Sequence, residues 1–484
     1  MASVRHCALS YHQLCEPSVQ NKSNLEIERL IRKLWWLLLV FPCSTYASTQ
    51  VHEYQLKNGL KLLVEEDHRA PVVVSQIWYK VGSSYEHNGI TGISHVLEHM
   101  MFKGTQKHGP GEFSRIIAEN GGRENAFTGS DYTAYFQLLE KSRLDVSMEM
   151  ESDRMRNLTL PPEEFKKELE VVKEERHMRT DDNPHALTEE QFNSVAYDNN
   201  PYKHPVIGWS NDLDNMTVDD VRAWYTRWYV PNNATLVIAG DVNPDEVYKM
   251  AEKYYGPIPA GKVVAPKPRV EGEQLGLRRL VVRTPAQVPY LLLGYKVPVL
   301  TTDKKNWEPY ALDVLSGILS AGRSARLPRI LIREKQIAVA ADAGYNMQAL
   351  HSNLFEVDAT PAPGHTVAEL EQALREQIAQ LRDEKVSADE LDRVKAQVIA
   401  NKVYEKDSVF YQGMILGTLE TVGLSWKLAD EYVDKIKAVT AEQVQAVARK
   451  YLIDDHLTVA QLEPQSMDKK PKRKAHVLPP YSHQ

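Results

Sequence analysis

The segments LKLLV at residues 60–64 and IWYKV at residues 77–81 return later in the chain as LRRLV at 277–281 and LGYKV at 293–297. Short runs that are rich in Leu, Ile and Val are typical of strands. The two copies of the second segment begin 216 residues apart. A similar pair of segments at one offset indicates a duplicated unit.

The other end of the unit also repeats. MTVDDV at residues 216–221 returns 223 residues later as VTAEQV at 439–444, and a helical pattern leads from each copy into a strand, at Thr235–Ala239 and Leu457–Ala460. The sequence therefore predicts two homologous halves. The alternative is chance similarity between short amphipathic segments.

Each half mixes strands with long helices. Apolar or alternating runs predict strands at Val72–Trp78 and Thr133–Leu139, and helical periodicity predicts helices at Glu163–Arg179 and Val367–Leu381. Strands and helices do not alternate one for one, which argues against a doubly wound fold. We therefore expect an α+β fold of two homologous halves, each an antiparallel sheet with helices packed on it.

Changes in composition set the expected domain boundaries. Proline and glycine are dense in GPIPAGK and PKP, which predicts a linker at 257–272. The linker separates an N-terminal domain at 48–256 from a homologous second domain at 273–464. Residues 465–484 are rich in Lys and Arg and are expected to form a disordered basic tail. Residues 1–47 are expected to be a leader and signal peptide.

The overall composition is that of a globular protein. The chain has 484 residues, of which 43% are hydrophobic and 25% are charged, and this excludes collagen, long disorder and a polytopic membrane protein. The formal net charge of −7 argues against nucleic acid as a partner. The three cysteines, Cys7, Cys15 and Cys43, all lie in the leader.

The leader has the pattern of an export signal. Three basic residues between positions 29 and 33 precede the apolar run 34–41, and small residues follow up to Ala47. This pattern predicts a secretory signal that is cleaved near Ala47. The run is shorter than the roughly 20 residues of a membrane span, so we expect no stable span. The alternatives are a short buried helix or a single anchor. We expect a periplasmic protein rather than a mitochondrial one, because mitochondrial presequences are poor in acidic residues and Glu26 and Glu28 lie in this leader.

The stretch TGISHVLEHMMFKG at residues 91–104 carries the most specific chemical signal. Its apolar residues predict a largely buried helix, on which His95 and His99 lie one turn apart and share a face with Glu98. Buried polar groups need partners, and a zinc ion held by two neutral imidazoles is one. Glu98 can then take a proton from the attacking water. The spacing is an inverted His-Glu-x-x-His motif. The alternative is a pair of core histidines that are hydrogen-bonded to Glu98 and the backbone.

A catalytic zinc site needs a third protein ligand and keeps one position open. The helix that is predicted from Glu163 offers Glu168 and Glu175, which are seven residues apart on one face beside the apolar stripe. The alternative is a solvated acidic face that pairs with lysines of the same helix. Periodicity alone leaves both interpretations open.

In these features the sequence resembles the pitrilysin and mitochondrial processing peptidase family of zinc metallopeptidases, over nearly the whole body of the chain. His95-x-x-Glu98-His99 is similar to the family's inverted motif. The resemblance implies that Glu175, which lies 76 residues past His99, is the third ligand of one zinc ion per chain. It also implies that Glu168 is an additional acidic residue of the catalytic site.

The resemblance extends to the substrate. Asn125, Ala126, Phe127 and Thr128 resemble the family's edge strand, which pairs with the substrate backbone. Such pairing reads the main chain and would position an extended peptide. Members of the family enclose the site between two bowl-like halves, so the resemblance implies unfolded peptides as substrates. The second half reads Ala-Leu-Asp at 311–313, near where the zinc motif would fall, and is expected to be catalytically silent.

One departure from the family concerns a pair of residues that the second half often supplies near the zinc, an Arg and, seven positions later, a Tyr. Arg333 is present here, but the Tyr position holds Ala340. Tyr345 is better explained as an ordinary strand residue. The resemblance therefore implies a heterodimer in which a homologous chain supplies the Arg/Tyr pair, with a homodimer as the second choice.

The sequence as a whole predicts a zinc endopeptidase in which His95, His99 and Glu175 hold the metal and Glu98 activates water. A first rival is a catalytically weak, peptide-holding or structural subunit, which the missing Tyr favours and the complete ligand set disfavours. A second rival is a structural or storage zinc protein. Structural zinc sites are usually closed by four ligands, often Cys, and the chain has no Cys after position 43.

Overall fold

The structure is a computed structural model that describes residues 50–303 and 305–467. The predicted leader, its cleavage site and the three cysteines lie outside the described residues, as does the basic tail from residue 468 onward. Within the described part, no helix combines the length and the apolar character that crossing a bilayer requires.

The first half, residues 50–256, is built on a six-stranded sheet with the order β1-β2-β6-β3-β5-β4. Neighbouring strands are antiparallel, except that β2 and β6 are parallel. The strands are β1 (Val51–Gln55), β2 (Lys61–Glu66), β3 (Val72–Tyr79), β4 (Arg123–Thr128), β5 (Thr133–Glu140) and β6 (Ala234–Gly240).

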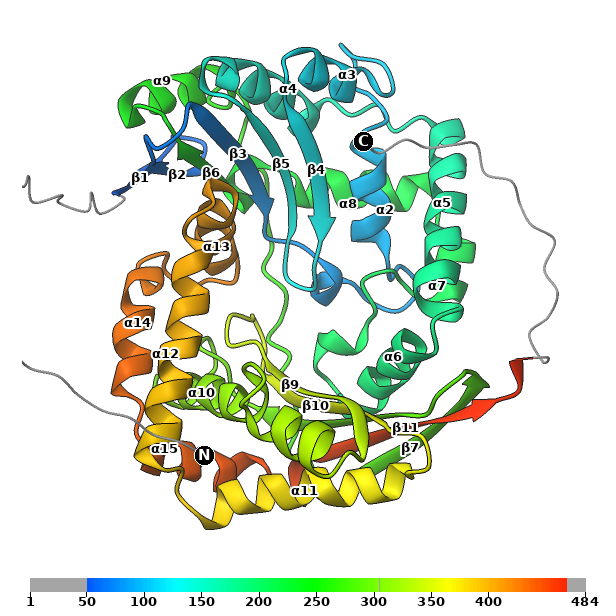
Figure 1. Cartoon of the computed structure of the whole chain (residues 1–484). Helices are drawn as coiled ribbons and strands as arrows, with labels where there is room; N and C mark the ends of the chain where they lie inside the picture. Colours follow the sequence, from blue (N-terminus) through cyan, green and yellow to red (C-terminus); the bar gives the residue numbers. More distant parts are fainter. Residues whose placement is uncertain (1–49, 304, 468–484) are drawn as a thin grey trace, which may run out of the picture. The chain divides into compact units, whose positions relative to one another are not determined.

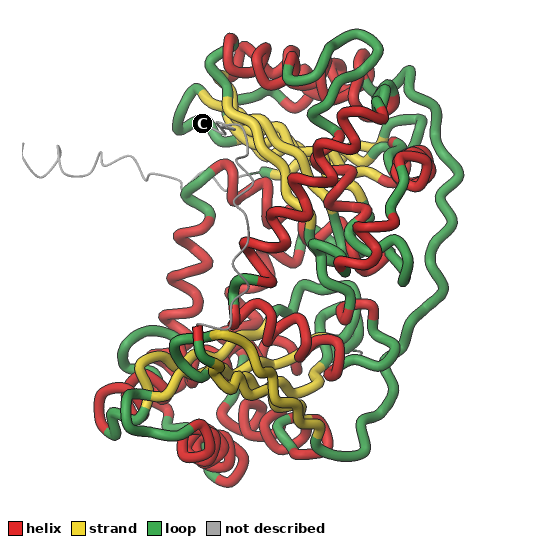
Figure 2. Tube along the Cα trace, turned by 90° about the vertical axis from the view of Figure 1, so that its right-hand side faces the viewer, coloured by secondary structure: helices red, strands yellow, loops and turns green. Residues whose placement is uncertain are grey.

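The second half, residues 273–467, repeats this arrangement with five strands in the order β7-β11-β8-β10-β9. These strands are β7 (Arg278–Pro285), β8 (Tyr290–Val297), β9 (Ala338–Tyr345), β10 (Asn353–Pro361) and β11 (Leu457–Gln465). The order matches β2-β6-β3-β5-β4, which confirms the α+β expectation of two homologous halves, and Figure 2 shows the strands as two separate sheets.

The expectation of an antiparallel sheet in each half needs one correction. β7 and β11 are parallel, like β2 and β6. In each half the last strand returns to the sheet after a series of helices and lies beside the first strand of the repeat. A long helical connection permits a parallel pair, whereas a tight hairpin does not.

The helices account for most of the remaining chain. Those of the first half are α2 (Ile93–Met100), α3 (Glu112–Glu119), α4 (Leu144–Arg156), α5 (Pro162–Arg176), α6 (Pro184–Ala196), α7 (Ser210–Asn215), α8 (Val218–Trp228) and α9 (Pro244–Tyr254). Those of the second half are α10 (Glu308–Ser320), α11 (Val367–Asp383), α12 (Ala388–Glu405), α13 (Val409–Thr421), α14 (Leu428–Ala438) and α15 (Ala441–Tyr451). Short 3-10 turns lie at Ser83–Tyr85, Lys141–Arg143, Pro201–Lys203, Pro231–Asn233 and Asp454–His456.

The helix that was expected at Glu163–Arg179 changes its geometry near its end. α5 is α-helical up to Arg176, and the chain continues as the wider π-type turn η3 (His177–Asp181). A second turn of this type, η6, spans Pro328–Glu334. Wide turns inside helices are frequent at functional sites.

The two halves exchange one helix each. α13 belongs to the second half in sequence but packs on β6 and β3 of the first sheet, whereas α6 belongs to the first half and packs on β11 and β7 of the second sheet (Figure 1). Close approach explains why glycine stands at both contacts. A Cβ on Gly417 of α13 would lie 2.1 Å from Trp78 of β3, and one on Gly294 of β8 would lie 2.5 Å from Phe192 of α6.

The two faces of the first sheet therefore pack against different halves. Along β3, Ile77 and Tyr79 join the core that the first-half helices cover, while Trp78 between them joins a cluster with Leu416 of α13. Side chains of a strand alternate between faces, so one strand can serve both layers.

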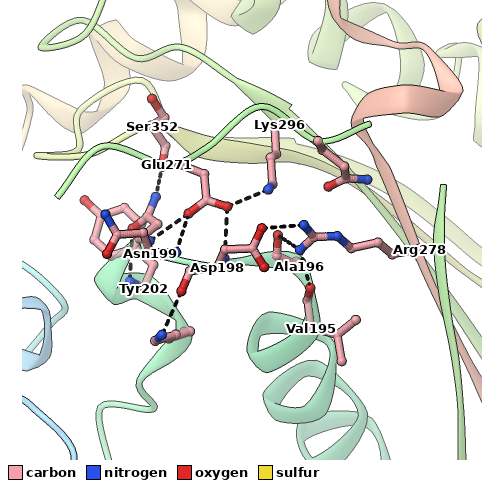
Figure 3. Close-up of polar contacts among 12 residues, drawn as sticks. Val195, Ala196, Asp198, Asn199, Tyr202, Glu271, Arg278, Lys296 and Ser352 are labelled. Atoms are coloured by element: carbon pink, nitrogen blue, oxygen red, sulfur yellow. Dashed lines mark hydrogen bonds and ion pairs between the residues drawn. The ribbon is translucent and has the colours of Figure 1, made fainter. Parts of the chain in front are cut away.

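The segment between the halves has no helix or strand from residue 259 to residue 275. It is nevertheless anchored, as Figure 3 shows. The Glu271 carboxylate accepts backbone N–H bonds from Asp198, Asn199 and Asn200 at 2.7–2.9 Å and pairs with Lys296 of β8 at 2.5 Å. The predicted linker thus fastens a first-half loop to the second sheet.

Candidate metal site

The two histidines of the 91–104 stretch lie on the short, mostly buried helix α2. The helix begins after Gly92, which has a φ of +84° and no side chain to cap the free N–H groups. The buried carboxylate of Glu86 takes over this role, because it accepts N–H bonds from Gly92 at 2.7 Å and Ser94 at 2.9 Å. Its burial raises the pKa of Glu86 to about 7, although both N–H donors favour the charged form. Sequence reasoning missed Glu86, and the only available signal was a helix that starts at glycine.

A second acid holds the segment before α2. Asp212 of α7 accepts the Thr91 hydroxyl at 2.6 Å and the Thr91 N–H at 3.2 Å. Thr91 in turn accepts the Trp209 N–H at 2.9 Å. The start of α2 is therefore fixed from two sides, which restricts where its histidines can lie.

α2 and α5 lie beside each other (Figure 1), and His95 and His99 of α2 approach Glu175 of α5. Glu175 Oε2 lies 3.6 Å from His95 Nε2 and 3.9 Å from His99 Nε2, and one ligand atom from each of the three residues lies within 4.8 Å of the others. A tetrahedral zinc with bonds of about 2.0–2.1 Å keeps its ligand atoms about 3.4 Å apart. The three side chains therefore fit a zinc ion after small adjustments.

The chemistry of the donors also fits the metal. Burial lowers the pKa of His95 to about 3, with further lowering from the charges of His99 and Arg179, so this imidazole is neutral near pH 7. Metal binding requires a neutral imidazole. Glu175 Oε1 lies 3.5 Å from the Arg179 guanidinium, whereas its Oε2 is buried without a hydrogen-bond donor. Burying a charged oxygen without a partner is costly, and a metal ion at Oε2 would remove this cost.

Glu168 contacts a histidine rather than joining the three converging groups. Its Oε2 lies 3.2 Å from His99 Nδ1, and its Oε1 pairs with Lys103 at 2.8 Å. Burial raises the pKa of Glu168, but the bonds from His99 and Lys103 outweigh burial, and the net shift is downward. A carboxylate behind a ligating histidine orients the ring. The geometry thus suits Glu168 for positioning His99.

Glu98 is paired with the predicted substrate strand. Its Oε2 accepts a short hydrogen bond from the Thr128 hydroxyl at the end of β4. Burial raises the pKa of Glu98, and the bond from Thr128 opposes this effect. A raised pKa suits a carboxylate that must take up a proton and release it again.

The expected substrate strand lies at the edge of the first sheet. Among the described strands, β4 pairs only with β5, with Ala126 opposite Tyr135 and Thr128 opposite Thr133. Its other edge offers backbone groups to an extended peptide. Asn125 on this strand is exposed, whereas the Phe127 ring packs against Trp78 with 5.4 Å between centroids.

The remaining predicted site residue is not brought to this group. Arg333 lies in η6, is exposed, and donates a hydrogen bond to the Arg323 carbonyl at 2.6 Å. No contact joins it to the three converging ligands in the described part of the chain. Tyr345 donates to the Pro298 carbonyl at 2.6 Å, as expected of an ordinary strand residue.

The described residues of the second half form no counterpart of the candidate metal site. At the position of the motif, α10 carries Asp313, which is half-buried and accepts a hydrogen bond from the Tyr432 hydroxyl at 2.6 Å. Among the described residues, only His95, His99 and Glu175 form a group of three or more possible metal ligands.

Comparison with known proteins also divides the chain into two parts, which correspond to the two halves. Residues 61–209 match the family described as Insulinase (Peptidase family M16), and residues 215–398 match the family described as Peptidase M16 inactive domain. The zinc protease PqqE of Helicobacter pylori is 30% identical over 91% of this chain and 100% of its own length. The uncharacterized zinc protease YmxG of Bacillus subtilis is 26% identical over 84% of this chain and 97% of its own length.

Solved structures share the fold. The crystal structure of a protease from Helicobacter pylori matches with a TM-score of 0.81 and 30% identity over 86% of this chain and 100% of that one. The periplasmic protease PqqL of Escherichia coli matches with a TM-score of 0.71 and 19% identity over 90% of this chain. The present chain covers 52% of PqqL, so it spans about half of that protein.

Proposed function

The chain belongs to peptidase family M16, and from its site we propose that it is a zinc-dependent endopeptidase that hydrolyses unfolded peptides. The observation that carries this proposal is the convergence of His95, His99 and Glu175 beside Glu98. Two imidazoles and one carboxylate leave a coordination position open, as catalytic zinc sites do.

A bound zinc ion supplies Lewis-acid chemistry, since it lowers the pKa of water and polarises a peptide carbonyl. His95, His99 and Glu175 hold the ion, and Glu168 keeps the His99 ring in place through Nδ1. Glu98 takes a proton from the attacking water and later gives it to the leaving amine. Thr128 holds one oxygen of Glu98, so the other oxygen is free for the proton transfer.

The free edge of β4 supports an extended peptide as the substrate. A peptide that pairs with Asn125–Thr128 adds a strand to the sheet, and its backbone then runs past Glu98, which is bonded to Thr128. This mode of binding reads main-chain groups and requires an unfolded segment.

Two further features of the proposal concern assembly and location. Ala340 stands where the family often has a Tyr, which supports a heterodimer in which a homologous chain supplies the Arg/Tyr pair; a homodimer is the second choice. The absence of a Tyr at this position also favours the alternative of a weakly active, peptide-holding subunit. The leader pattern supports a periplasmic location, the compartment that is also named for PqqL.

The proposal is tested on the purified chain by measuring bound zinc and the cleavage of an unstructured peptide. We expect Glu98→Gln to keep the zinc and to lower kcat by about 100-fold or more. Glu175→Gln should lose zinc affinity and keep its fold. Glu170→Gln on the exposed side of the same helix is the matched control and should change neither property.

The outcomes separate the proposals. Full activity of Glu98→Gln, or full zinc occupancy of Glu175→Gln, would show that the assigned roles are wrong. Activity that appears only when a homologous chain is added supports the heterodimer. Activity of the chain alone excludes an obligatory heterodimer, and zinc without activity in either case supports the peptide-holding subunit.

A further inference from the structure

Arg176 follows the proposed ligand Glu175 directly and ends α5. Its guanidinium is buried and makes a two-point ion pair with Glu190 of α6, with Nη1 at 2.7 Å and Nη2 at 2.9 Å from the two carboxylate oxygens. Burial opposes the charge of Arg176, but the pair with Glu190 outweighs this effect and raises the pKa of Arg176. The last turn of α5 is thereby fastened to α6.

The same guanidinium also reaches the segment before α2. Arg176 Nη1 donates to the Gly208 carbonyl at 2.8 Å. Gly208 has a φ of +86°, and a Cβ there would lie 2.5 Å from the Thr91 carbonyl oxygen. Arg176 therefore connects the helix of Glu175 with the start of the helix that carries His95 and His99.

α6, which holds Glu190, is anchored in the second half. Phe192 is fully buried in a cluster with Tyr290 and Leu292 of β8 and with Leu462 of β11. At the end of α6, Arg278 of β7 donates to the carbonyls of Val195 at 2.7 Å and Ala196 at 3.2 Å (Figure 3).

An ion pair also secures this end, because Arg278 lies 2.5 Å from Asp198 (Figure 3). Contacts thus run without a break from Glu175 through Arg176, Glu190 and α6 to the second sheet.

We infer that Arg176 is a positioning residue for the metal site and that α6 couples zinc affinity to the docking of the second half. This inference rests on the proposed zinc site. The reason is geometric. Directly after Arg176 the chain leaves α-helical geometry for the π-type turn, so the helix's own hydrogen bonds do not support Glu175 from the C-terminal side in the usual way. Arg179 of η3 also pairs with Glu175 Oε1, at 3.5 Å, but this pair is exposed on the Arg179 side and such pairs contribute little. The buried pair of Arg176 with Glu190 is therefore the stronger restraint on where Glu175 lies relative to the two imidazoles.

Coupling of this kind is reciprocal. If the docking of α6 on the second sheet improves the ligand geometry, zinc binding must strengthen that docking to the same degree. The second half, which has no metal ligand of its own among the described residues, would then contribute to catalysis by holding Glu175 in place.

The test measures zinc affinity by competition with a chelator, and the coordination geometry by the visible spectrum of bound Co²⁺, in the full chain. The main variant is Arg176→Met with Glu190→Met, which replaces the ion pair by apolar side chains and leaves no charge buried alone. We expect zinc affinity to fall by about 10–100-fold, as is typical when a group that orients metal ligands is lost. Hydrogen exchange of the α6 amides should slow on adding zinc to the wild type but not to this variant.

The control is Arg326→Met with Glu390→Met. This second-half pair is also two-point, through Nε at 2.9 Å and Nη2 at 2.7 Å, and it has no contact with the proposed metal ligands. We expect its zinc affinity and Co²⁺ spectrum to match those of the wild type. Unchanged affinity in the Arg176 variant, or an equal loss in the control, overturns the inference.

A milder pair of variants serves if the main one does not fold. Arg278→Gln removes the anchor at the end of α6. Its control is Arg283→Gln, on the same strand as Arg278, which removes an exposed ion pair with Glu463 of β11. Lower zinc affinity in Arg278→Gln alone supports the coupling, and equal affinities overturn it. A wild-type chain that binds no zinc refutes the proposed function itself, which separates that failure from failure of the coupling.

Discussion

Replacing Gly417 by alanine adds one methyl group where the exchanged helix α13 crosses the first sheet. The new Cβ would lie 2.1 Å from Cε2 and 2.2 Å from Nε1 of Trp78. Trp78 cannot retreat easily, because it is fully buried and its indole N–H donates to Gln76 at 3.0 Å. Its ring also packs edge-on against Tyr132, with 5.1 Å between centroids.

The expected magnitude is the difference of two opposing effects. Carbon atoms in contact are normally about 3.5–4.0 Å apart, so α13 or Trp78 must shift by about 1.5 Å. Overpacking of this kind costs about 1–3 kcal/mol, and the rigid surroundings of Trp78 favour the upper end. Alanine regains about 1 kcal/mol over glycine through helix propensity. We therefore expect Gly417→Ala to lower the free energy of unfolding by about 2 kcal/mol.

The assay is urea unfolding followed by circular dichroism. Gly317→Ala in α10 is the control, because the close neighbours of a Cβ there would be methyl groups of Val394 and Val398, at 2.8 and 3.0 Å, and no ring. We expect this control to remain closer to the wild type. A Gly417→Ala variant that is as stable as the wild type, or more stable by its gain in helix propensity, would show that α13 does not lie against Trp78.

Two further variants test the site and the second sheet. Thr128→Val removes the hydroxyl that donates to Glu98, and a lost bond to a charged group is worth about 1.5–3 kcal/mol, so kcat should fall about tenfold or more. Bound zinc and KM of the valine variant should not change. The control variant Thr128→Ser keeps a hydroxyl and should keep most of the activity. An unchanged kcat in the valine variant would refute the role of Thr128 in positioning Glu98. Burial, with the nearby charges of Glu189 and Asp358, raises the pKa of Glu356 to about 7 from a usual 4.5. Between these two pKa values the Glu356 carboxyl loses its proton in the unfolded chain but keeps it in the folded one. The free energy of unfolding therefore falls as the pH rises through this range. Glu356→Gln should therefore add up to about 3 kcal/mol to the free energy of unfolding at pH 8 and nothing at pH 4, and an equal gain at both would exclude the charge as the cause.

The sequence alone determined the features that repeat over short distances. The strand that was expected at Val72–Trp78 is observed at Val72–Tyr79, and the helix expected at Val367–Leu381 is observed at Val367–Asp383. His95 and His99 share a face because a helix turns once in 3.6 residues, so their spacing is local information. The duplication was also readable, because both halves keep similar segments at similar offsets.

The acidic helix shows where periodicity reaches its limit. Glu168 and Glu170 are two residues apart on α5, yet Glu168 is buried against His99 and Lys103, while the Glu170 side chain is 70% exposed and pairs with Lys173. Periodicity alone allowed either a ligand-bearing face or a solvated one. The face was decided by α2, which comes from a distant part of the sequence and packs against α5.

Only the tertiary structure decided how the halves are joined. The sequences of α6 and α13 do not indicate which sheet each helix packs on. An amphipathic pattern predicts that one face of a helix is buried, but it does not identify the partner. Glu86, Arg176 and Glu271 look like ordinary surface charges in the sequence, and each acquires its role from backbone groups or side chains that folding brings to it. The pairing of His95 with His99 could be predicted from their spacing because both lie on one helix, whereas Glu175 was assigned only through the family resemblance. The groups that hold the two helices in place depend on contacts between segments far apart in the chain.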